Sequence, residues 1–122
     1  MPIVDVTLVV ELDVELAPDL ARLLADGIGR ALKSPPGQTW VRLHVLAPDR
    51  YAENQSTPQA NDLPVFANVL QRQLAQASEL EREISALTEA IAQSTARPPA
   101  CVHVEFAPAA AGRLSFGGKL VT

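Results

Sequence analysis

The sequence is poor in cysteine, histidine and aromatic residues, with one cysteine, two histidines and five aromatic side chains in 122 residues. The lone Cys101 excludes an intramolecular disulfide and is typical of a chain from a reducing compartment, so we expect a cytoplasmic protein. His44 and His103 are the only histidines and form no repeated ligand spacing, so a metal ion is not expected. With so few aromatic residues, aliphatic and alanine side chains must supply most of the core.

The sequence also lacks a run of charge of one sign and a long apolar segment. Its 10 basic and 14 acidic residues are interspersed and give a net charge of -4, which argues against nucleic acid as a partner. No apolar run approaches the roughly 20 residues that span a bilayer, and the N-terminus has no basic segment, so we expect neither a membrane partner nor export. A chain of 122 residues fits a single domain over residues 1–122.

A strand, helix, strand pattern occupies residues 2–46. Alternating apolar residues predict a strand over residues 2–10. Pro18 suits the first turn of a following helix, whose apolar residues recur at helical spacing at Leu20, Leu23, Leu24, Ile28 and Ala31. The SPPG stretch at residues 34–37 ends this helix, and the alternation in TWVRLHVLAP predicts a second strand.

The same pattern returns in residues 64–122, after a connecting segment at residues 47–63 that is rich in turn-forming residues. Pro64 opens the apolar stretch PVFANVL. The SELE sequence at residues 78–81 has the pattern of a capping box, which predicts the start of a second helix. The apolar face of this helix is expected to contain Leu80, Ile84, Leu87 and Ile91. A second Pro-Pro pair ends the helix, and ACVHVEFAP predicts the fourth strand.

The two halves are copies of one unit, offset by about sixty residues. Ile28 and Ile91 each precede the first proline of their Pro-Pro pair by seven residues, and Leu24 and Leu87 by eleven. Because a helix that crosses between parallel strands is almost always right-handed, two copies predict an α/β (α+β) fold with a four-stranded mixed sheet and both helices on one face. The other face is too mixed for a plain solvent surface, which predicts its burial against other subunits; it carries Asp5, Thr7, Trp40, Arg42, His44, His103 and Glu105.

Three motifs mark a resemblance to a known family. They are MPIVDV at the start, a helix-ending Pro-Pro followed by VRLHV or VHVEF, and the tail GRLSFGGKL. The tail is similar to the GHFGIGGEL type of ending in oxalocrotonate tautomerase chains, and VHVEFAPAAAG is similar to a strand and loop of macrophage migration inhibitory factor. The chain therefore resembles the fused-repeat branch of the tautomerase superfamily, and the resemblance implies a homotrimer.

The resemblance implies a cofactor-independent keto-enol tautomerase, an isomerase of a small enol or unsaturated keto acid, with Pro2 as general base. Removal of Met1 would give Pro2 a secondary amine, the only backbone nitrogen of the chain able to exchange a proton near neutral pH. A free α-amino group titrates at about 7.7–8.0, and burial and nearby cations both disfavour its charged form. Pro64 occupies the matching place in the second copy, but its nitrogen lies in a peptide bond, so one site per chain is expected.

The same resemblance implies that cationic or polar side chains bind the carboxylate of the substrate, namely Arg72, Arg42, His103 and Lys33. Each also has a structural explanation. Arg42 can form an ion pair across a subunit boundary, and Arg72 can be an ordinary exposed residue at a strand end. His103 can be a hydrogen-bonded interface residue, and Lys33 suits the dipole of a helix C-terminus. The sequence departs in two places from the pattern of the short-chain members of this family. It has no arginine after the first strand, and Leu114 stands where those members have an aromatic residue in the tail.

Two alternatives remain open at this point. One is a dehalogenase or decarboxylase of a small unsaturated acid, in which a carboxylate such as Glu105 activates water. The other is a catalytically inactive trimeric binding or scaffold protein, which the missing arginine and aromatic residue favour.

Overall fold

The two halves of the chain fold into the same unit. The computed structural model describes residues 1–122. The first unit contains β1 (Ile3–Val9), α1 (Leu20–Ala31) and β2 (Trp40–Leu46). The second unit contains β3 (Val65–Leu70), α2 (Ala77–Thr95) and β4 (Val102–Phe106). The connecting segment holds two short 3-10 helices, Pro48–Arg50 and Ala60–Asp62, and a third, Pro99–Cys101, precedes β4.

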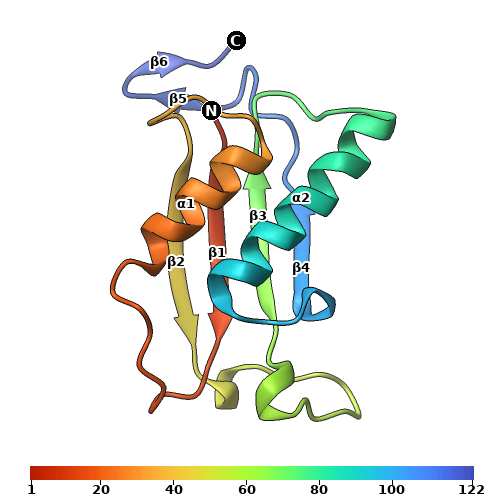
Figure 1. Ribbon diagram of the computed structural model, residues 1–122. Coiled ribbons are helices and arrows are strands. Elements are labelled where there is room, and N and C mark those ends of the chain that lie inside the picture. The colour runs from red at the N-terminus through yellow and green to blue at the C-terminus, as the bar shows by residue number, and fades with distance from the viewer.

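The four long strands form one mixed sheet in the order β2-β1-β3-β4. Each unit contributes a parallel pair, and the two units join through the antiparallel pair of β1 and β3 at the centre of the sheet. Both helices lie across the same face, with α1 on the side of β2 and α2 on the side of β4 (Figure 1). The predicted α/β (α+β) architecture is therefore confirmed.

The core lies between the sheet and the two helices and is almost entirely aliphatic. β1 buries alternate side chains there, and both helices add their apolar faces; the innermost side chains are Val4, Val6, Leu8, Leu24, Ile28, Val65, Val69, Leu87 and Ile91. Burial of one such side chain contributes about 1.5–3 kcal/mol. The helices approach each other closely at Gly27, where an added Cβ would lie 3.4 Å from the Cβ of Ala90. Glycine at this position therefore lets α1 and α2 pack side by side.

The first half of α2 differs from the prediction. The helix begins at Ala77 and no side chain caps it, so Ser78 already lies in the first turn and the SELE capping box does not form. The buried face is also shifted, because Ile84 is 41% exposed whereas the neighbouring Glu83 is only 7% exposed. Glu83 shares its helix face with Leu87, four residues further on, and this face turns toward the sheet and leaves Ile84 at the edge.

Arg97, just past α2, connects the helix end to two neighbouring segments. Its Nη1 donates hydrogen bonds to the backbone oxygens of Val9, at 2.9 Å, and Leu63, at 2.5 Å. Burial lowers the pKa of this guanidinium. The side chain thus joins the end of β1 to the segment that enters β3.

Replacement of Arg97 with methionine is expected to lower the free energy of unfolding by about 1 to 2 kcal/mol, because two backbone oxygens lose their donor. Arg22→Met is the matched control, since the Arg22 side chain is 66% exposed and pairs only with Asp19 and Asp26 around its own helix. The control is expected to change stability by less than about 0.5 kcal/mol. Chemical denaturation measures both variants, and equal destabilisation would contradict the role given to Arg97.

The segment after β4 returns across the end of the sheet at which β1 begins. It forms a hairpin of β5 (Ser115–Phe116) and β6 (Lys119–Leu120), which lies beside the N-terminus (Figure 1). Phe116 packs on Trp40 at the start of β2, with ring centroids 4.4 Å apart. This contact holds the hairpin near the N-terminal end of β1.

Neither helix combines the length and the apolar character that crossing a membrane requires. No group of three or more His, Cys, Asp or Glu side chains is arranged to hold a metal ion.

Candidate active site

Three of the residues predicted for the site line one cavity, at the end of the sheet where β1 begins. This cavity, here called the Pro2 cavity, has a volume of about 280 Å³ and contains Pro2, Lys33 and Arg72. Its other lining residues are Met1, Leu32, Ser34, Pro35, Gln71 and Gln73. Pro2 is buried, whereas Lys33 and Arg72 are exposed. The structure therefore brings a buried proline together with two cations from distant parts of the chain.

Pro2 is held in place by the strand that follows it. Its carbonyl oxygen accepts a hydrogen bond from the N–H of Trp40 at 3.1 Å, which belongs to the first pair of the β1–β2 ladder, Ile3 with Trp40. Proline suits this place because it has no N–H for the strand ladder. Met1 lines the same cavity, so an amine formed at Pro2 by removal of Met1 would lie at the cavity wall.

Lys33 is positioned by the way in which α1 ends. Its N–H donates to the carbonyl oxygen of Arg30 at 3.1 Å, and the N–H of Ser34 donates to that of Gly29 at 2.8 Å. This is the hydrogen-bond pattern of a Schellman motif, with Lys33 in the left-handed conformation at a φ of 55°. Glycine usually occupies that place because a Cβ is strained there. A lysine here costs stability and places an ammonium group beside the Pro2 cavity.

Replacement of Lys33 with glycine is expected to raise the free energy of unfolding by up to about 1 kcal/mol, because it relieves the left-handed strain. The same change is expected to weaken turnover of a carboxylated substrate, because the ammonium is lost. Ala96 offers a matched control, since it has a φ of 54° at the end of α2. Ala96→Gly is expected to give a similar gain in stability with unchanged turnover. Denaturation and steady-state kinetics measure both effects, and equal activity in the two variants would rule out a substrate role for Lys33.

Arg72 lies just past β3 and is held by the C-terminal segment. Its Nε donates to the backbone oxygen of Thr122, and its own carbonyl oxygen accepts a hydrogen bond from Ala111 at 3.2 Å. These contacts fix the backbone and the Nε side of the guanidinium. The Nη groups form no side-chain hydrogen bond within the chain, which leaves them for a planar anion such as a carboxylate.

The other two predicted residues lie on the open face of the sheet, away from the Pro2 cavity. Arg42 donates from Nε and Nη2 to the carboxylate of Asp5, its neighbour across the strands, at 2.6 and 2.8 Å. The Arg42 guanidinium holds the pKa of the Asp5 carboxyl below its usual range. His103, on β4, packs beside Phe66 with ring centroids 5.3 Å apart. Within one chain the sheet separates Arg42 and His103 from the cavity, and their substrate roles remain predictions.

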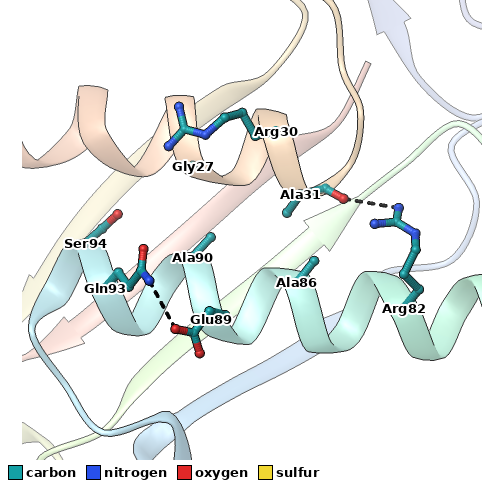
Figure 2. A pocket seen from close by; sticks show the side chains of 9 residues that line it. All are labelled: Gly27, Arg30, Ala31, Arg82, Ala86, Glu89, Ala90, Gln93 and Ser94. Atoms are coloured by element: carbon teal, nitrogen blue, oxygen red, sulfur yellow. Dashed lines mark hydrogen bonds between the residues drawn. The ribbon is translucent and has the colours of Figure 1, made fainter.

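A second cavity, of about 360 Å³, lies between α1 and α2 (Figure 2). Arg30 and Arg82 reach it from the two helices, and Arg82 donates to the carbonyl oxygen of Ala31 at 3.2 Å. Glu89 accepts a hydrogen bond from Gln93 at 3.1 Å along α2. Two of the three charged side chains of this second cavity thus form hydrogen bonds within the helix pair. The second cavity contains none of the residues predicted for the site, whereas the Pro2 cavity contains three of them. The Pro2 cavity is therefore the candidate active site.

Comparison with known proteins identifies the fold rather than a close relative. No family model and no curated protein matches the sequence. Among solved structures, the Q0 fused 4-OT symmetric trimer has a TM-score of 0.74 and 15% identity, over 98% of this chain and 94% of that one. Macrophage migration inhibitory factor from Oncomelania hupensis has a TM-score of 0.76 and 18% identity, over 100% and 83% of the chains. FG41 malonate semialdehyde decarboxylase inhibited by 3-bromopropiolate has a TM-score of 0.68 and 20% identity, over 94% and 88%.

These structures have in common the tautomerase-superfamily fold, and this chain has it over nearly its whole length. The resemblance predicted from the sequence motifs is therefore confirmed at the level of the fold. Because 4-OT and a decarboxylase have the same fold, the fold alone does not decide the reaction.

Gln71 also lines the Pro2 cavity and is not among the residues that the sequence predicts for it. Its place follows from the antiparallel pairing of β1 with β3, in which Ile3 lies opposite Leu70. In the same register, Pro2 and Gln71 are the next residues outward. Periodicity predicts which residues of one strand share a face, but it does not predict which two strands are neighbours. No local signal in the sequence therefore identifies Gln71.

Proposed function

We propose that the protein is a cofactor-independent keto-enol tautomerase that isomerises a small carboxylated enol or unsaturated keto acid, with Pro2 as general base after removal of Met1. The observation that carries this proposal is the cavity in which buried Pro2 lies beside Lys33 and Arg72. Partial desolvation and two nearby cations both disfavour a protonated amine. We therefore expect a substantial neutral fraction of the Pro2 amine at neutral pH, as a general base requires.

In the proposed reaction, the substrate carboxylate binds Arg72 and Lys33, which orients the enol over Pro2. The Pro2 nitrogen removes the proton of the enol hydroxyl, and the electron pair of the broken O–H bond forms the carbonyl. The electrons of the carbon–carbon double bond then take up a proton from the Pro2 ammonium and form a new C–H bond. The proton lost by oxygen is gained by carbon, so the amine returns to its neutral form and no cofactor is required.

We also propose that the protein forms a homotrimer through the open face of the sheet. The mixture of charged and aromatic side chains on this face supports its burial, and the Q0 fused 4-OT of the same fold is a symmetric trimer. Arg42 and His103 lie on this face, so a substrate role for either would require the cavity of a neighbouring subunit. The cytoplasm is the proposed compartment, supported by the single unpaired thiol of Cys101.

Intact-mass measurement combined with turnover of enol acids tests the proposal. We expect the purified protein to lack Met1 and to isomerise at least one member of a panel of enolpyruvates and 2-hydroxydienoates, followed by ultraviolet absorbance. 3-Bromopropiolate, which inhibits the FG41 decarboxylase, is expected to add covalently to the Pro2 amine and to stop turnover. Peptide mass mapping locates the adduct. Retention of Met1, or full turnover by protein that carries the 3-bromopropiolate adduct on Pro2, would contradict the proposed mechanism.

A decarboxylase of a small unsaturated acid is the second candidate, because the FG41 decarboxylase has the same fold. Glu105, the carboxylate considered for water activation, lies on β4 and accepts a hydrogen bond from Asn68 at 3.4 Å, outside the Pro2 cavity. Release of carbon dioxide from a 3-oxo acid, or of halide from a haloacrylate, without enol isomerisation would favour this candidate. No turnover of any of these substrates, with an ordinary titration of the Pro2 amine, would favour an inactive trimeric scaffold.

A further inference from the structure

Gln71 carries a buried polar atom that has no partner. Its side-chain Oε1 is inaccessible to solvent and accepts no hydrogen bond, a state that only two other side-chain atoms of the chain have, on Thr39 and Glu83. A buried acceptor without a donor costs about 1–3 kcal/mol, so an atom of this kind calls for an explanation. Of the three residues, only Gln71 lines the Pro2 cavity.

The register of β1 and β3 directs Gln71 toward Pro2. The two strands are antiparallel, and their pairing ends with Val4 opposite Val69 and Ile3 opposite Leu70. In the same register Pro2 and Gln71 are the next residues outward, and both line the Pro2 cavity. Residues opposite each other in an antiparallel pair have Cβ atoms about 4.5–5.5 Å apart and point to the same face of the sheet. The backbone of Gln71 is also fixed, because its carbonyl oxygen accepts a hydrogen bond from the N–H of Ala110 at 2.8 Å.

The cations of the cavity do not satisfy this oxygen. The Nε of Arg72 donates to Thr122 instead, and Lys33 forms no side-chain hydrogen bond with Gln71. The Pro2 nitrogen cannot donate while it is joined to Met1, because a proline peptide nitrogen has no hydrogen. Removal of Met1 changes this, since a free proline amine has one N–H when neutral and two when protonated. A processed N-terminus would therefore carry a hydrogen-bond donor on the cavity that Gln71 also lines.

We propose that the Oε1 of Gln71 accepts a hydrogen bond from the Pro2 amine once Met1 has been removed, and that this bond favours the protonated form of the amine. The inference rests on the proposed function, which it deepens by assigning a further residue to the site. A hydrogen bond to the charged form stabilises that form. Gln71 therefore opposes the effect of Lys33 and Arg72, and the balance between them sets the pH at which Pro2 changes from acid to base.

Titration of the Pro2 amine in Gln71 variants tests this inference. The measurement uses the protein labelled with 15N-proline, followed by NMR, together with the pH profile of kcat/KM. Gln71→Met keeps the size of the side chain but removes the acceptor, and it is expected to lower the pKa of the Pro2 amine by about one unit. Gln71→Glu offers a charged acceptor and is expected to raise it by at least as much.

Gln73→Met is the matched control, because Gln73 lines the same cavity but its amide is not buried without a partner. It is expected to leave the titration of Pro2 unchanged. If Met1 is retained, or the Pro2 nitrogen of the unaltered protein does not titrate, both the proposed function and this inference are wrong. If Pro2 titrates and the enol acid turns over, but neither Gln71 variant moves the titration more than Gln73→Met does, the proposed function stands and the role of Gln71 is overturned.

Discussion

Alanine in place of Pro2 is expected to lower kcat/KM for enol-acid isomerisation by about 100-fold or more, because a positioned general base contributes roughly 10² to 10⁴ in rate. The variant still has an amine after removal of Met1. That amine is primary, and it lacks the ring that fixes the direction of the nitrogen lone pair at the cavity. Steady-state kinetics measure the loss, and intact-mass measurement establishes that Met1 is absent from both proteins.

Pro64 provides the matched control for this experiment. It is buried at the head of the second unit, as Pro2 is at the head of the first, but its nitrogen lies within the chain. Its carbonyl oxygen accepts a hydrogen bond from Val9 at 3.1 Å, which Pro64→Ala retains. We expect this variant to change kcat/KM by less than about twofold. Similar losses for the two variants would show that the effect of Pro2→Ala is structural, and would contradict its role as the base.

Arg72→Gln is expected to lower kcat/KM by about 100-fold, mainly through a higher KM, because hydrogen bonds to a charged partner contribute about 1.5–3 kcal/mol each. The loss is expected for carboxylated substrates and to be much smaller for the corresponding esters. Arg72→Lys is expected to recover only part of the activity, since lysine keeps the charge but not the planar fork. Steady-state kinetics with an acid and its methyl ester measure these differences.

Arg113→Gln controls for the removal of a positive charge near the C-terminal segment, because Arg113 is exposed and does not line the Pro2 cavity. Thermal unfolding of both variants shows whether the lost contact between Arg72 and Thr122 loosens that segment. An Arg72→Gln variant that loses no more activity on the acid than on the ester would contradict carboxylate binding by Arg72.

Local patterns in the sequence predict the architecture because each unit of the fold is itself local. The alternation in β1 and the helical spacing of Leu24 and Ile28 describe side chains a few residues apart, and both patterns match the burial seen in the structure. The repeated Pro-Pro pairs mark both helix ends. The prediction is wrong where packing between distant segments determines which face of a helix is buried. An example is α2, in which Glu83 is buried although the apolar pattern predicts Ile84 in the core.

The candidate site is predicted less completely, because it is assembled from three separate segments. The sequence resemblance names Pro2, Lys33 and Arg72, and the structure brings them to one cavity. The sequence does not predict Gln71 as a site residue, because its position at the Pro2 cavity depends on the pairing of two strands from different units. The roles of Arg42 and His103 depend on contacts beyond a single chain, so they stay predictions.

The matched helix ends also have a consequence for the second unit. Arg97 takes the place that Ser34 has at the end of α1, directly after a left-handed residue and before a Pro-Pro pair. Its guanidinium binds the backbone beside Pro64, at Leu63 and Val9. In the first copy the smaller Ser34 stands at this position and lines the Pro2 cavity. The two copies thus use one position differently: in the second it holds a side chain that ties three segments of the backbone together.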